Sequence, residues 1–458
     1  MKKKYVRWTL WTIASPFILF IILCILIYLP PIQNFLVDKA AVYASEATGM
    51  NISVGRISLS FPLNLVVTDV DAASPHKDTL LSVRRLQVNV QLLPLLKKQV
   101  EVDGISLQGA TVNSNDLIHG MRLNGTLGEL FISSHGVALD PETAIVNKVL
   151  LKDTDLSLCL NDTAAADTAA SDTTYWKIIL QDIDLQNVSF ALDMPLDSLS
   201  LAASLDNAIL RDGLIDLHKS AYSLQTFRIK NGRVRYDSGR PSATASADSL
   251  SAGLDPSHIA LTDIGVKLDS LYYEGRNMKA VISQFVLKER SGVEIVSATG
   301  RMVSNDKVLR VPSLKLETRD SYLELNAAMD WDALDFKKEG LVSARLMADI
   351  GKPDVVRFMG SMDEKFIRKY PSEPLRIRTG IDGDLNKLKL TTLTAELPGA
   401  LELFAKGELT SLTDSLLRGG DITLQAETKD LKFISTLAEG IEIPYGTRLE
   451  GKFTMAGP

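Results

Sequence analysis

Paired carboxylates are the residues of this sequence best placed to do chemistry. Asp153 and Asp155 alternate along one expected strand, and Asp182 and Asp184 alternate along another. Two carboxylates on one strand face could ligate a cation or act as general acid and base. The same spacing is also typical of the solvated face of a strand. No further catalytic group accompanies either pair, so we interpret both pairs as surface residues.

Metal and cofactor motifs are absent from the sequence. The stretch 382–386 (DGDLN) has the start of a calcium loop, but Lys387 stands where glycine is needed and no glutamate closes the loop. We predict a turn there. Cys24 lies inside the long hydrophobic segment near the N-terminus and Cys159 lies far outside it, so we predict no disulfide between them. The five histidines lack the HExxH or HxxxH spacing of a zinc site. They are His76, His119, His135, His218 and His258.

No nucleophile or phosphate-binding motif occurs either. The chain has no GxSxG sequence, no glycine-rich phosphate loop and no HExxH sequence. We therefore predict no catalytic residue, no metal site and no cofactor, and a protein that is not an enzyme. A hydrolase built from dispersed Ser, His and Asp residues stays as the alternative, although no motif favours it.

Composition narrows the classes of partner. The 458 residues are 45% hydrophobic and 23% charged, with a net charge of −6. A nucleic-acid partner normally requires a basic domain or stripe, so none is expected. The length exceeds that of one ordinary core and predicts either two or three domains or a repetitive array.

An uncharged run predicts a transmembrane helix over residues 8–30. About 22 residues of helix span about 33 Å, which is enough to cross a hydrocarbon core. The basic residues of the tail 1–7 precede the run, so the N-terminus should be cytoplasmic and the rest of the chain should lie outside the cytoplasm. A cleaved signal peptide is the competing interpretation, but the run is long and ends without a small-x-small cleavage site. The expected anchor residues are Trp8, Trp11, Pro16, Tyr28 and Leu29.

After the anchor the pattern is first helical and then alternating. Apolar residues at helical spacing predict an amphipathic, membrane-proximal helix over 32–49, with Gly49 as its cap. This helix could lie on lipid, plug the start of a sheet or pack on the next domain. From residue 50 onward, apolar residues alternate with polar ones, as in an antiparallel sheet with one dry face. The clearest alternating residues are Leu86, Val88, Val90, Leu92, Val188, Phe190, Leu192, Leu323, Leu325, Leu401, Leu403, Ile422 and Leu424.

The alternation repeatedly changes phase. The apolar parity flips after Gly104, at Asn187 and across Asn231-Gly232. A tight turn or a β-bulge would produce each flip, and bulges bend and twist a sheet. Repeated flips therefore predict a curved sheet rather than a flat one.

The organisation of the remaining chain follows from composition and a weak repeat. We expect a first β region over 50–160, a disordered acidic loop over 161–174 and further β-sheet repeats over 175–340. Residues 354–370 are a helical candidate. The stretches 344–349 and 422–427 resemble each other, and each is followed by a helical pattern, a proline and another strand, so 341–458 is expected to be a repeat region that continues beyond the chain end.

The order of several motifs resembles the AsmA/TamB-like family. An N-terminal anchor is followed by a short helix ending in Thr48-Gly49, then by the strand motif 52–58 (ISVGRIS) and the strand motif 103–112 (DGISLQGATV). The stretch 224–237 (LQTFRIKNGRVRYD) is similar to a strand pair that recurs in that family. Each piece alone is weak, whereas their order over the first 112 residues carries the resemblance.

The resemblance implies a mainly β fold: a transmembrane helix, then a long, curved, repetitive antiparallel sheet that forms an open trough, with a few short helices. It implies an inner-membrane protein whose bulk is periplasmic and whose apolar groove carries membrane lipids between the two membranes. The alternating residues named above would line that groove. The alternative is a scaffold for outer-membrane protein clients, or for protein secretion, working with an outer-membrane barrel partner of the TamA/BamA-like class. Periodicity alone is equally compatible with a closed β-sandwich, in which the apolar faces would form an ordinary core.

Overall fold

The computed structural model describes most of the chain after the expected anchor. The described residues are 39, 41–42, 45–46, 48–60, 64–74, 78–91, 102–114, 120–138, 142–161, 175–239, 253–335, 338–358, 364–412, 418–436 and 444–456. The expected tail 1–7, the anchor 8–30 with Trp8, Trp11, Pro16, Tyr28 and Leu29, the groove candidate Leu92 and nearly all of the loop 161–174 lie outside them. Among the described residues, no helix combines the length and the hydrophobicity that a membrane crossing requires.

The described end of the helix expected over 32–49 follows the sequence pattern. Residues 39, 41–42, 45–46 and 48 are helical. Gly49 has a φ of 68° and its amide donates to the Ser45 carbonyl at 2.9 Å. A glycine in the left-handed region is the usual helix terminator because it carries no Cβ. The predicted cap at Gly49 is confirmed.

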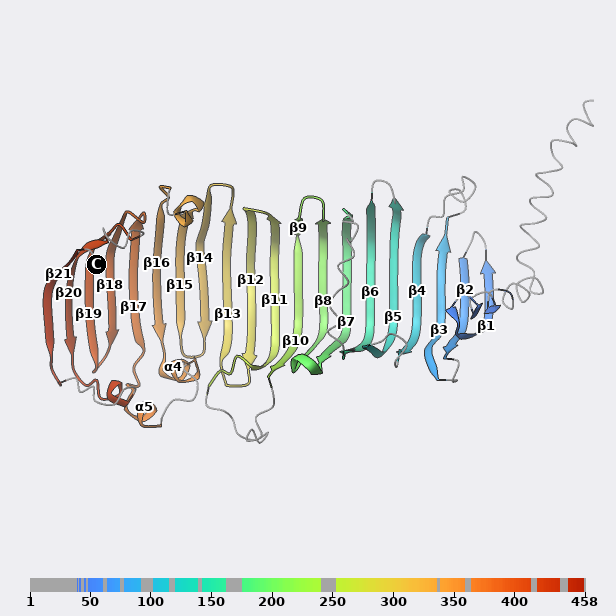
Figure 1. The fold of residues 1–458 in the computed structure, drawn as a ribbon, viewed down its shortest axis with the longest axis horizontal. Coiled ribbons are helices and arrows are strands. Elements are labelled where there is room, and N and C mark those ends of the chain that lie inside the picture. Colours follow the sequence, from blue (N-terminus) through green and yellow to red (C-terminus); the bar gives the residue numbers. More distant parts are fainter. Residues whose placement is uncertain are drawn as a thin grey trace, which may run out of the picture. The chain divides into compact units, whose positions relative to one another are not determined.

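The chain divides into two compact units, each containing an antiparallel sheet (Figure 1). Unit 1 comprises Met1–Thr174 and Ile178–Leu196, and unit 2 comprises Tyr175–Lys177 and Asp197–Pro458. In unit 1, β1 to β6 pair in chain order, and Asn187 Nδ2 on β7 donates to Asp153 Oδ1 on β6 at 2.8 Å. Its strands are β1 (Asn51–Ser60), β2 (Asn64–Ala73), β3 (Thr79–Val90), β4 (Val102–Asn113), β5 (Met121–Ala138), β6 (Thr143–Leu160) and all but the first residue of β7 (Lys177–Met194), which η1 (Pro195–Asp197) follows.

Unit 2 continues the same plan with one interrupted strand. The short β9 and the longer β10 follow each other between β8 and β11, so together they fill one strand position. From β11 to β21 each strand pairs with the next. The strands are β8 (Leu199–Asp216), β9 (Ala221–Leu224), β10 (Thr226–Ser238), β11 (His258–Glu274), β12 (Asn277–Glu289), β13 (Glu294–Ser304), β14 (Val308–Thr318), β15 (Tyr322–Asp330), β16 (Val342–Ile350), β17 (Leu375–Gly383), β18 (Lys387–Leu397), β19 (Leu401–Thr410), β20 (Gly419–Thr428) and β21 (Arg448–Ala456).

A crease of left-handed residues and glycines crosses the strands of unit 1. Gly55 on β1 faces Asp69 on β2, which has a φ of 55°, and Gly128 on β5 faces Asp153 on β6, which has a φ of 49°. A Cβ built on Gly128 would lie 2.8 Å from the Asp153 Cβ, so the left-handed residue requires glycine opposite. At the crease, the apolar residues of a strand are three positions apart instead of two. The apolar positions therefore change between even and odd residue numbers there. In β1 the half-buried positions change from even to odd numbers at Gly55.

The phase flips seen in the sequence correspond to such irregularities. Asn187 and Asn231 have φ values of 52° and 55°, and the pairing of β10 with β11 shifts register on both sides of Gly232. Between β3 and β4 the register shifts where Asn89 pairs with Gly104 and Val90 with Val102. Asn and Asp tolerate the left-handed region better than other side chains do. The predicted irregularity is confirmed at all three places, as a register shift at Gly104 and at Asn231-Gly232 and as a left-handed residue at Asn187.

Short helices pack against one end of the unit 2 sheet. The helical candidate 354–370 forms two helices, α4 (Lys352–Phe358) and α5 (Glu364–Lys369). Two short turns of 3-10 helix also occur in unit 2. The turn η2 (Trp331–Leu334) follows β15, and the turn η3 (Ile434–Thr436) follows β20. A buried cluster joins α5 and η3 to the β18–β19 turn and consists of Phe366, Tyr370, Leu397, Ala400, Leu431 and Phe433. Burial raises the pKa of the Tyr370 hydroxyl.

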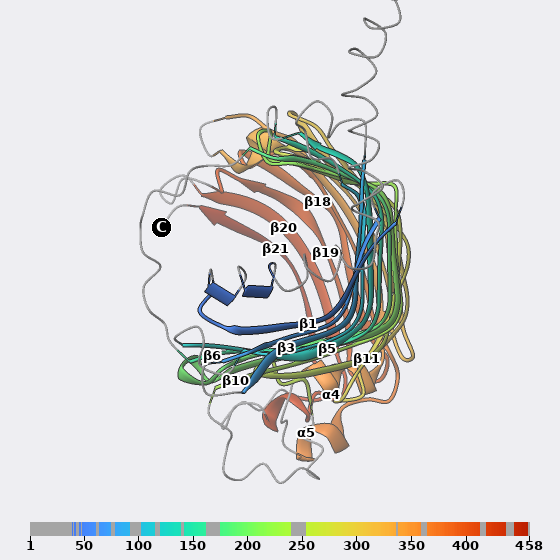
Figure 2. The same cartoon turned by 90° about the vertical axis from the view of Figure 1, so that its right-hand side faces the viewer.

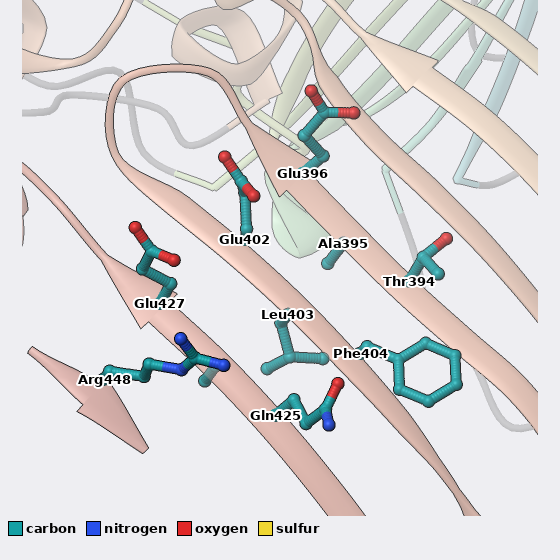
Figure 3. Close-up of a pocket in the computed structure, with 10 residues that line it drawn as sticks. Thr394, Ala395, Glu396, Glu402, Leu403, Phe404, Gln425, Glu427 and Arg448 are labelled. Carbon is teal, nitrogen blue, oxygen red and sulfur yellow. The ribbon is translucent and has the colours of Figure 1, made fainter. Parts of the chain in front are cut away.

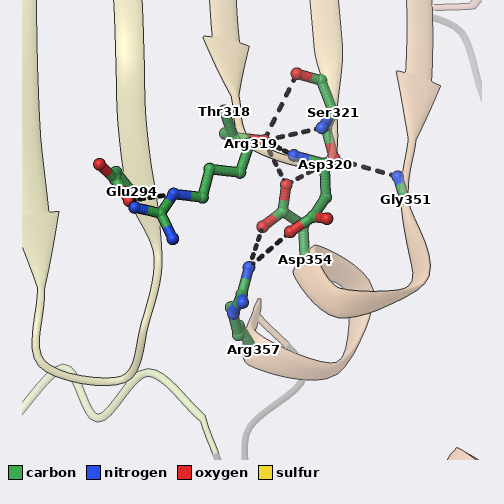
Figure 4. A network of polar contacts seen from close by, with 8 residues as sticks. All are labelled: Glu294, Thr318, Arg319, Asp320, Ser321, Gly351, Asp354 and Arg357. Atoms are coloured by element: carbon green, nitrogen blue, oxygen red, sulfur yellow. Dashed lines mark hydrogen bonds and ion pairs between the residues drawn. The ribbon is translucent and has the colours of Figure 1, made fainter.

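A buried aspartate fixes α4 to the turn between β14 and β15 (Figure 4). Asp354 is 1% exposed and accepts hydrogen bonds from the Thr318 and Ser321 hydroxyls, the latter at 2.6 Å. Arg357 donates to Asp354 at 3.1 Å and to Asp320 at 2.8 Å. A buried carboxylate is tolerated only when its lone pairs are satisfied, and here two hydroxyls and a guanidinium satisfy them.

We expect Asp354→Ala to destabilise this end of the sheet by about 3 kcal/mol or more, because it leaves buried donors without an acceptor. Asp320→Ala is the control, since Asp320 is 30% exposed and its ion pair should contribute less than about 1 kcal/mol. Hydrogen exchange of α4 and of the β14–β15 turn measures both effects. Equal exchange in the two variants would contradict the proposed anchoring.

Candidate functional site

One uninterrupted row of apolar residues crosses the unit 2 sheet from β8 to β21. Residues that pair directly across antiparallel strands lie on the same face. Following the pairings from β8 to β21 gives row 1, in which every residue is apolar. Row 1 consists of Ala208, Ile229, Val266, Phe285, Ala298, Leu316, Leu323, Ala348, Ile377, Ala395, Leu403, Ala426 and Leu449.

Three more rows lie beside row 1 on the same face. In β16 they begin at every second residue from Ala348, and this strand contains no bulge that would change its parity. Row 2 includes Phe227, Leu268, Ile282, Leu314, Leu325, Leu346, Leu393, Ala405 and Leu424; row 3 includes Val311, Ala327, Ala344, Ile381, Leu390, Ile422 and Phe453; row 4 includes Ile215, Tyr222, Tyr273, Met278, Leu309, Met329, Val342, Leu388 and Leu409. Between these residues the rows contain only glycine, Thr379 and Ser304, and no charge.

Unit 1 has the same arrangement on its own sheet. Row A consists of Ile57, Val67, Leu86, Leu107, Leu130 and Leu151, and row B of Leu59, Leu65, Val88, Ile105, Ile132 and Val149. On the other side of the crease, row C consists of Val54, Val70, Val83, Ala110, Leu127 and Thr154. The only polar member, Thr154, is 2% exposed and donates to its own strand, to the Lys152 carbonyl.

The apolar rows line the concave face of each sheet. The strands of each unit bend along their length (Figure 2). Side chains converge and shield one another on a concave face, whereas they splay apart on a convex face. In β16, Leu346 is half-buried and Ala348 is 2% exposed, while Arg345 and Met347 between them are exposed. β1 shows the same contrast between its apolar and polar positions.

The opposite face is charged, and many of its charges are paired. Arg378 lies 2.8 Å from Asp349, and Lys387 lies 3.1 Å from Glu408. The hydrogen bond from the Ser343 hydroxyl, and then that from Arg345, lowers the pKa of Asp382. Cross-strand ion pairs of this kind suit a hydrated surface. The sheet therefore has one dry and one wet face, as the alternation predicts.

The first pair of carboxylates belongs to that hydrated surface, whereas Asp182 and Asp184 on β7 are half-buried. Asp153 and Asp155 are exposed, and they accept hydrogen bonds from Asn187 and from Ser189 on β7. Asp384 accepts from the amides of Asn386 and Lys387 at 2.7 Å each and closes a turn, as predicted. Within the described part of the chain, no three His, Cys, Asp or Glu residues are arranged to hold a metal ion.

A pocket of about 350 Å³ lies on β18 to β21 and is lined by Ala395, Leu403 and Ala426 of row 1 and by residues one position out of phase with them (Figure 3). Glu396, Glu402 and Glu427 follow one another across the three strands, and Arg448 of β21 lies near Glu427. Arg376 lies 3.4 Å from Glu396 and Lys429 lies 2.9 Å from Glu402. The hydrogen bond to Glu402 raises the pKa of Lys429. Because two of the carboxylates already have cationic partners, this pocket offers no evident acid–base pair.

The residues named from the sequence fall into several places. Leu323, Leu325, Leu403, Ile422 and Leu424 lie in rows 1 to 3, and Leu86 and Val88 lie in rows A and B. Val90 lies at the register shift of β3. Leu401 instead packs against the buried cluster at α5 and η3. Val188, Phe190 and Leu192 lie on β7, where Phe190 is 38% exposed.

Sequence reasoning missed several alanines of row 1, Ala298 and Ala348 among them. Ala348 and Ala298 are 2% and 7% exposed, and each lies between larger residues of the neighbouring strands. An alanine carries little alternation signal alone. Its membership in the row depends on which residues pair across strands, and that information would have required the register.

Comparison with known proteins gives no relative. No protein-family model matches this chain, and no curated protein sequence matches it.

Proposed function

We propose that this protein is a lipid conduit, in which the concave apolar face carries phospholipids between the inner and outer membranes. The observation that supports this most directly is row 1, an apolar row without a break from β8 to β21. A conduit needs continuity, because a single charged position would force the acyl chain back into water. Twelve strand spacings of about 4.8 Å make the row about 58 Å long.

The driving force requires no covalent chemistry. Each CH₂ group removed from water contributes about 0.8 kcal/mol, so an acyl chain on the apolar face is held at any position along it. Because rows 1 to 4 repeat on successive strands, neighbouring positions are similar in energy. A lipid could therefore move along the face without crossing a large barrier.

The cellular setting is part of the same proposal. The uncharged run 8–30 and the basic tail 1–7 support a single-pass anchor in the inner membrane, with the described β units in the periplasm. The resemblance to the AsmA/TamB-like family supports the same placement. In the alternative assembly role, the sheet would contact outer-membrane protein clients and a barrel partner instead of lipids.

In-cell photo-crosslinking tests the proposal. A photoreactive residue replaces Leu325 in row 2 or Val88 in row B, and mass spectrometry identifies the adducts. The matched controls are Glu324 and Asn89, which precede or follow these residues on the same strands and face the opposite side. We expect phospholipid adducts at Leu325 and Val88 and few at the controls. Adducts to protein alone, or none, would exclude the conduit, and protein adducts would favour the assembly role.

A further inference from the structure

Rows 1 to 4 of unit 2 form an apolar band, and from β14 to β19 its row 1 side is covered by short helices. Beyond row 1, the next residues on the same face include Leu375, Leu397 and Leu401, which pack against the buried cluster formed with α5 and η3. The neighbouring strand ends at β14 and β15 are covered by α4 through Asp354. This side, at the bottom of Figure 1, is therefore occupied by the protein itself.

The other side of the band ends in aromatic residues and a cation. In row 4, Tyr222 and Tyr273 stack with ring centroids 6.1 Å apart and are 40% and 43% exposed. Trp331 follows directly after β15, two residues beyond Met329 of row 4. Its indole nitrogen donates a hydrogen bond to the Asn305 carbonyl at 2.8 Å. The Arg276 guanidinium lies 5.6 Å from the centre of the Trp331 ring. We call these four residues the lip: Tyr222, Tyr273, Arg276 and Trp331.

The chemistry of the lip matches that of a membrane interface. Tyr and Trp concentrate where hydrocarbon meets water because their rings are apolar at one end and polar at the other. Arg276 is exposed and could donate to a phosphate while its guanidinium remains over the indole ring. The covered side has buried aromatic residues instead, so the two sides of the band differ in kind.

The width of the band matches a phospholipid tail. From Ala348 in row 1 to Val342 in row 4 is six residues along β16, or about 20 Å at roughly 3.3 Å per residue. The hydrocarbon of one membrane leaflet is about 15 Å thick, which is half of the roughly 30 Å bilayer core. A two-chain lipid laid along the strands would therefore fit between the covered side and the lip.

We infer that phospholipids bind this face in one orientation, with their acyl chains along the strands, their methyl ends toward row 1 and their phosphate beside Arg276 at the lip. This inference rests on the proposed function and adds the orientation in which the phospholipid is bound. The lipids would lie side by side with parallel tails and would move from one strand to the next. Their headgroups would stay at the uncovered side of the band throughout.

Two photoreactive phospholipids test the orientation on the purified full chain. One carries a diazirine at the end of an acyl chain and the other carries it on the headgroup, and peptide mass spectrometry maps the adducts. We expect acyl-end adducts near row 1, at β15 and β16, and headgroup adducts confined to the peptides around Tyr273, Arg276 and Trp331. Headgroup adducts at the α5 side, or equally at both sides, would overturn the orientation and leave the conduit intact. If neither probe labels rows 1 to 4, the proposed function itself fails.

A substitution adds an independent readout. Arg276→Gln should lower headgroup adducts at the lip several-fold while leaving acyl-end adducts near row 1. Arg310→Gln is the matched control, because Arg310 is exposed on β14 and lies one position out of phase with Leu309 of row 4. Equal headgroup labelling in both variants would contradict the role of Arg276.

Discussion

Gly128→Val should disrupt the sheet of unit 1. A Cβ at this position would lie 2.8 Å from the Asp153 Cβ and 3.0 Å from the Lys152 carbonyl oxygen. Those atoms belong to β6, which pairs with β5, so they cannot move without breaking ladder hydrogen bonds. Overpacking of this kind costs about 1–3 kcal/mol even for a methyl group, and the two extra methyl groups of valine should exceed that range. The effect should appear as fast hydrogen exchange in β5 and β6.

Two comparisons isolate the crease from strand propensity. Thr126→Val puts the same β-branched side chain on β5 at an exposed position, so it should preserve stability. Asn187→Gly removes a side chain from a left-handed residue and should change stability by less than about 1 kcal/mol, since glycine adopts this region freely. If Gly128→Val exchanged no faster than Thr126→Val, the glycine would not be required by its left-handed partner.

The crease shows which part of the fold is local and which is not. Asn187 and Asn231 interrupt an alternating pattern, so the sequence reveals the irregularity and its residue type predicts the left-handed backbone. Gly55 and Gly128 follow a different logic. They are needed because of the residues facing them, Asp69 and Asp153, and which residues face each other depends on strand register. One sequence read along its length contains no direct record of that register.

The candidate site divides in the same way. Alternation identifies Leu323, Leu325 and Leu403 as members of a dry face, because each contributes a strong apolar signal two residues from another. Continuity across strands is a separate property, and it required the alanines such as Ala348 to fall opposite them. The packing of Leu401 against α5 depends equally on tertiary contacts. Periodicity therefore predicts the face, while its extent and its borders are set by contacts between distant segments.

Leu325→Asp should block lipid movement without unfolding the sheet. Leu325 pairs with Leu314 on one side and with Leu346 on the other, so the carboxylate would interrupt row 2 near the middle of unit 2. The side chain is only half-buried, and water can hydrate the charge while the face is empty. An acyl chain passing over it must remove that water, and desolvating an uncompensated charge costs several kcal/mol. Each 1.36 kcal/mol of barrier lowers a rate tenfold, so transfer should slow by about 100-fold or more.

The control is Glu324→Lys, which reverses a charge at the neighbouring position on the wet face. It loses a 4.0 Å ion pair with Lys315 and the 2.8 Å hydrogen bond from the Tyr322 hydroxyl, and it should leave transfer unchanged because both contacts lie on the wet face. Transfer of a fluorescent phospholipid between two vesicle populations bridged by the full chain measures both variants, and circular dichroism verifies their folding. Normal transfer by a folded Leu325→Asp protein would mean that lipids do not travel along row 2, because no phospholipid tail could cross a bare carboxylate at an undiminished rate.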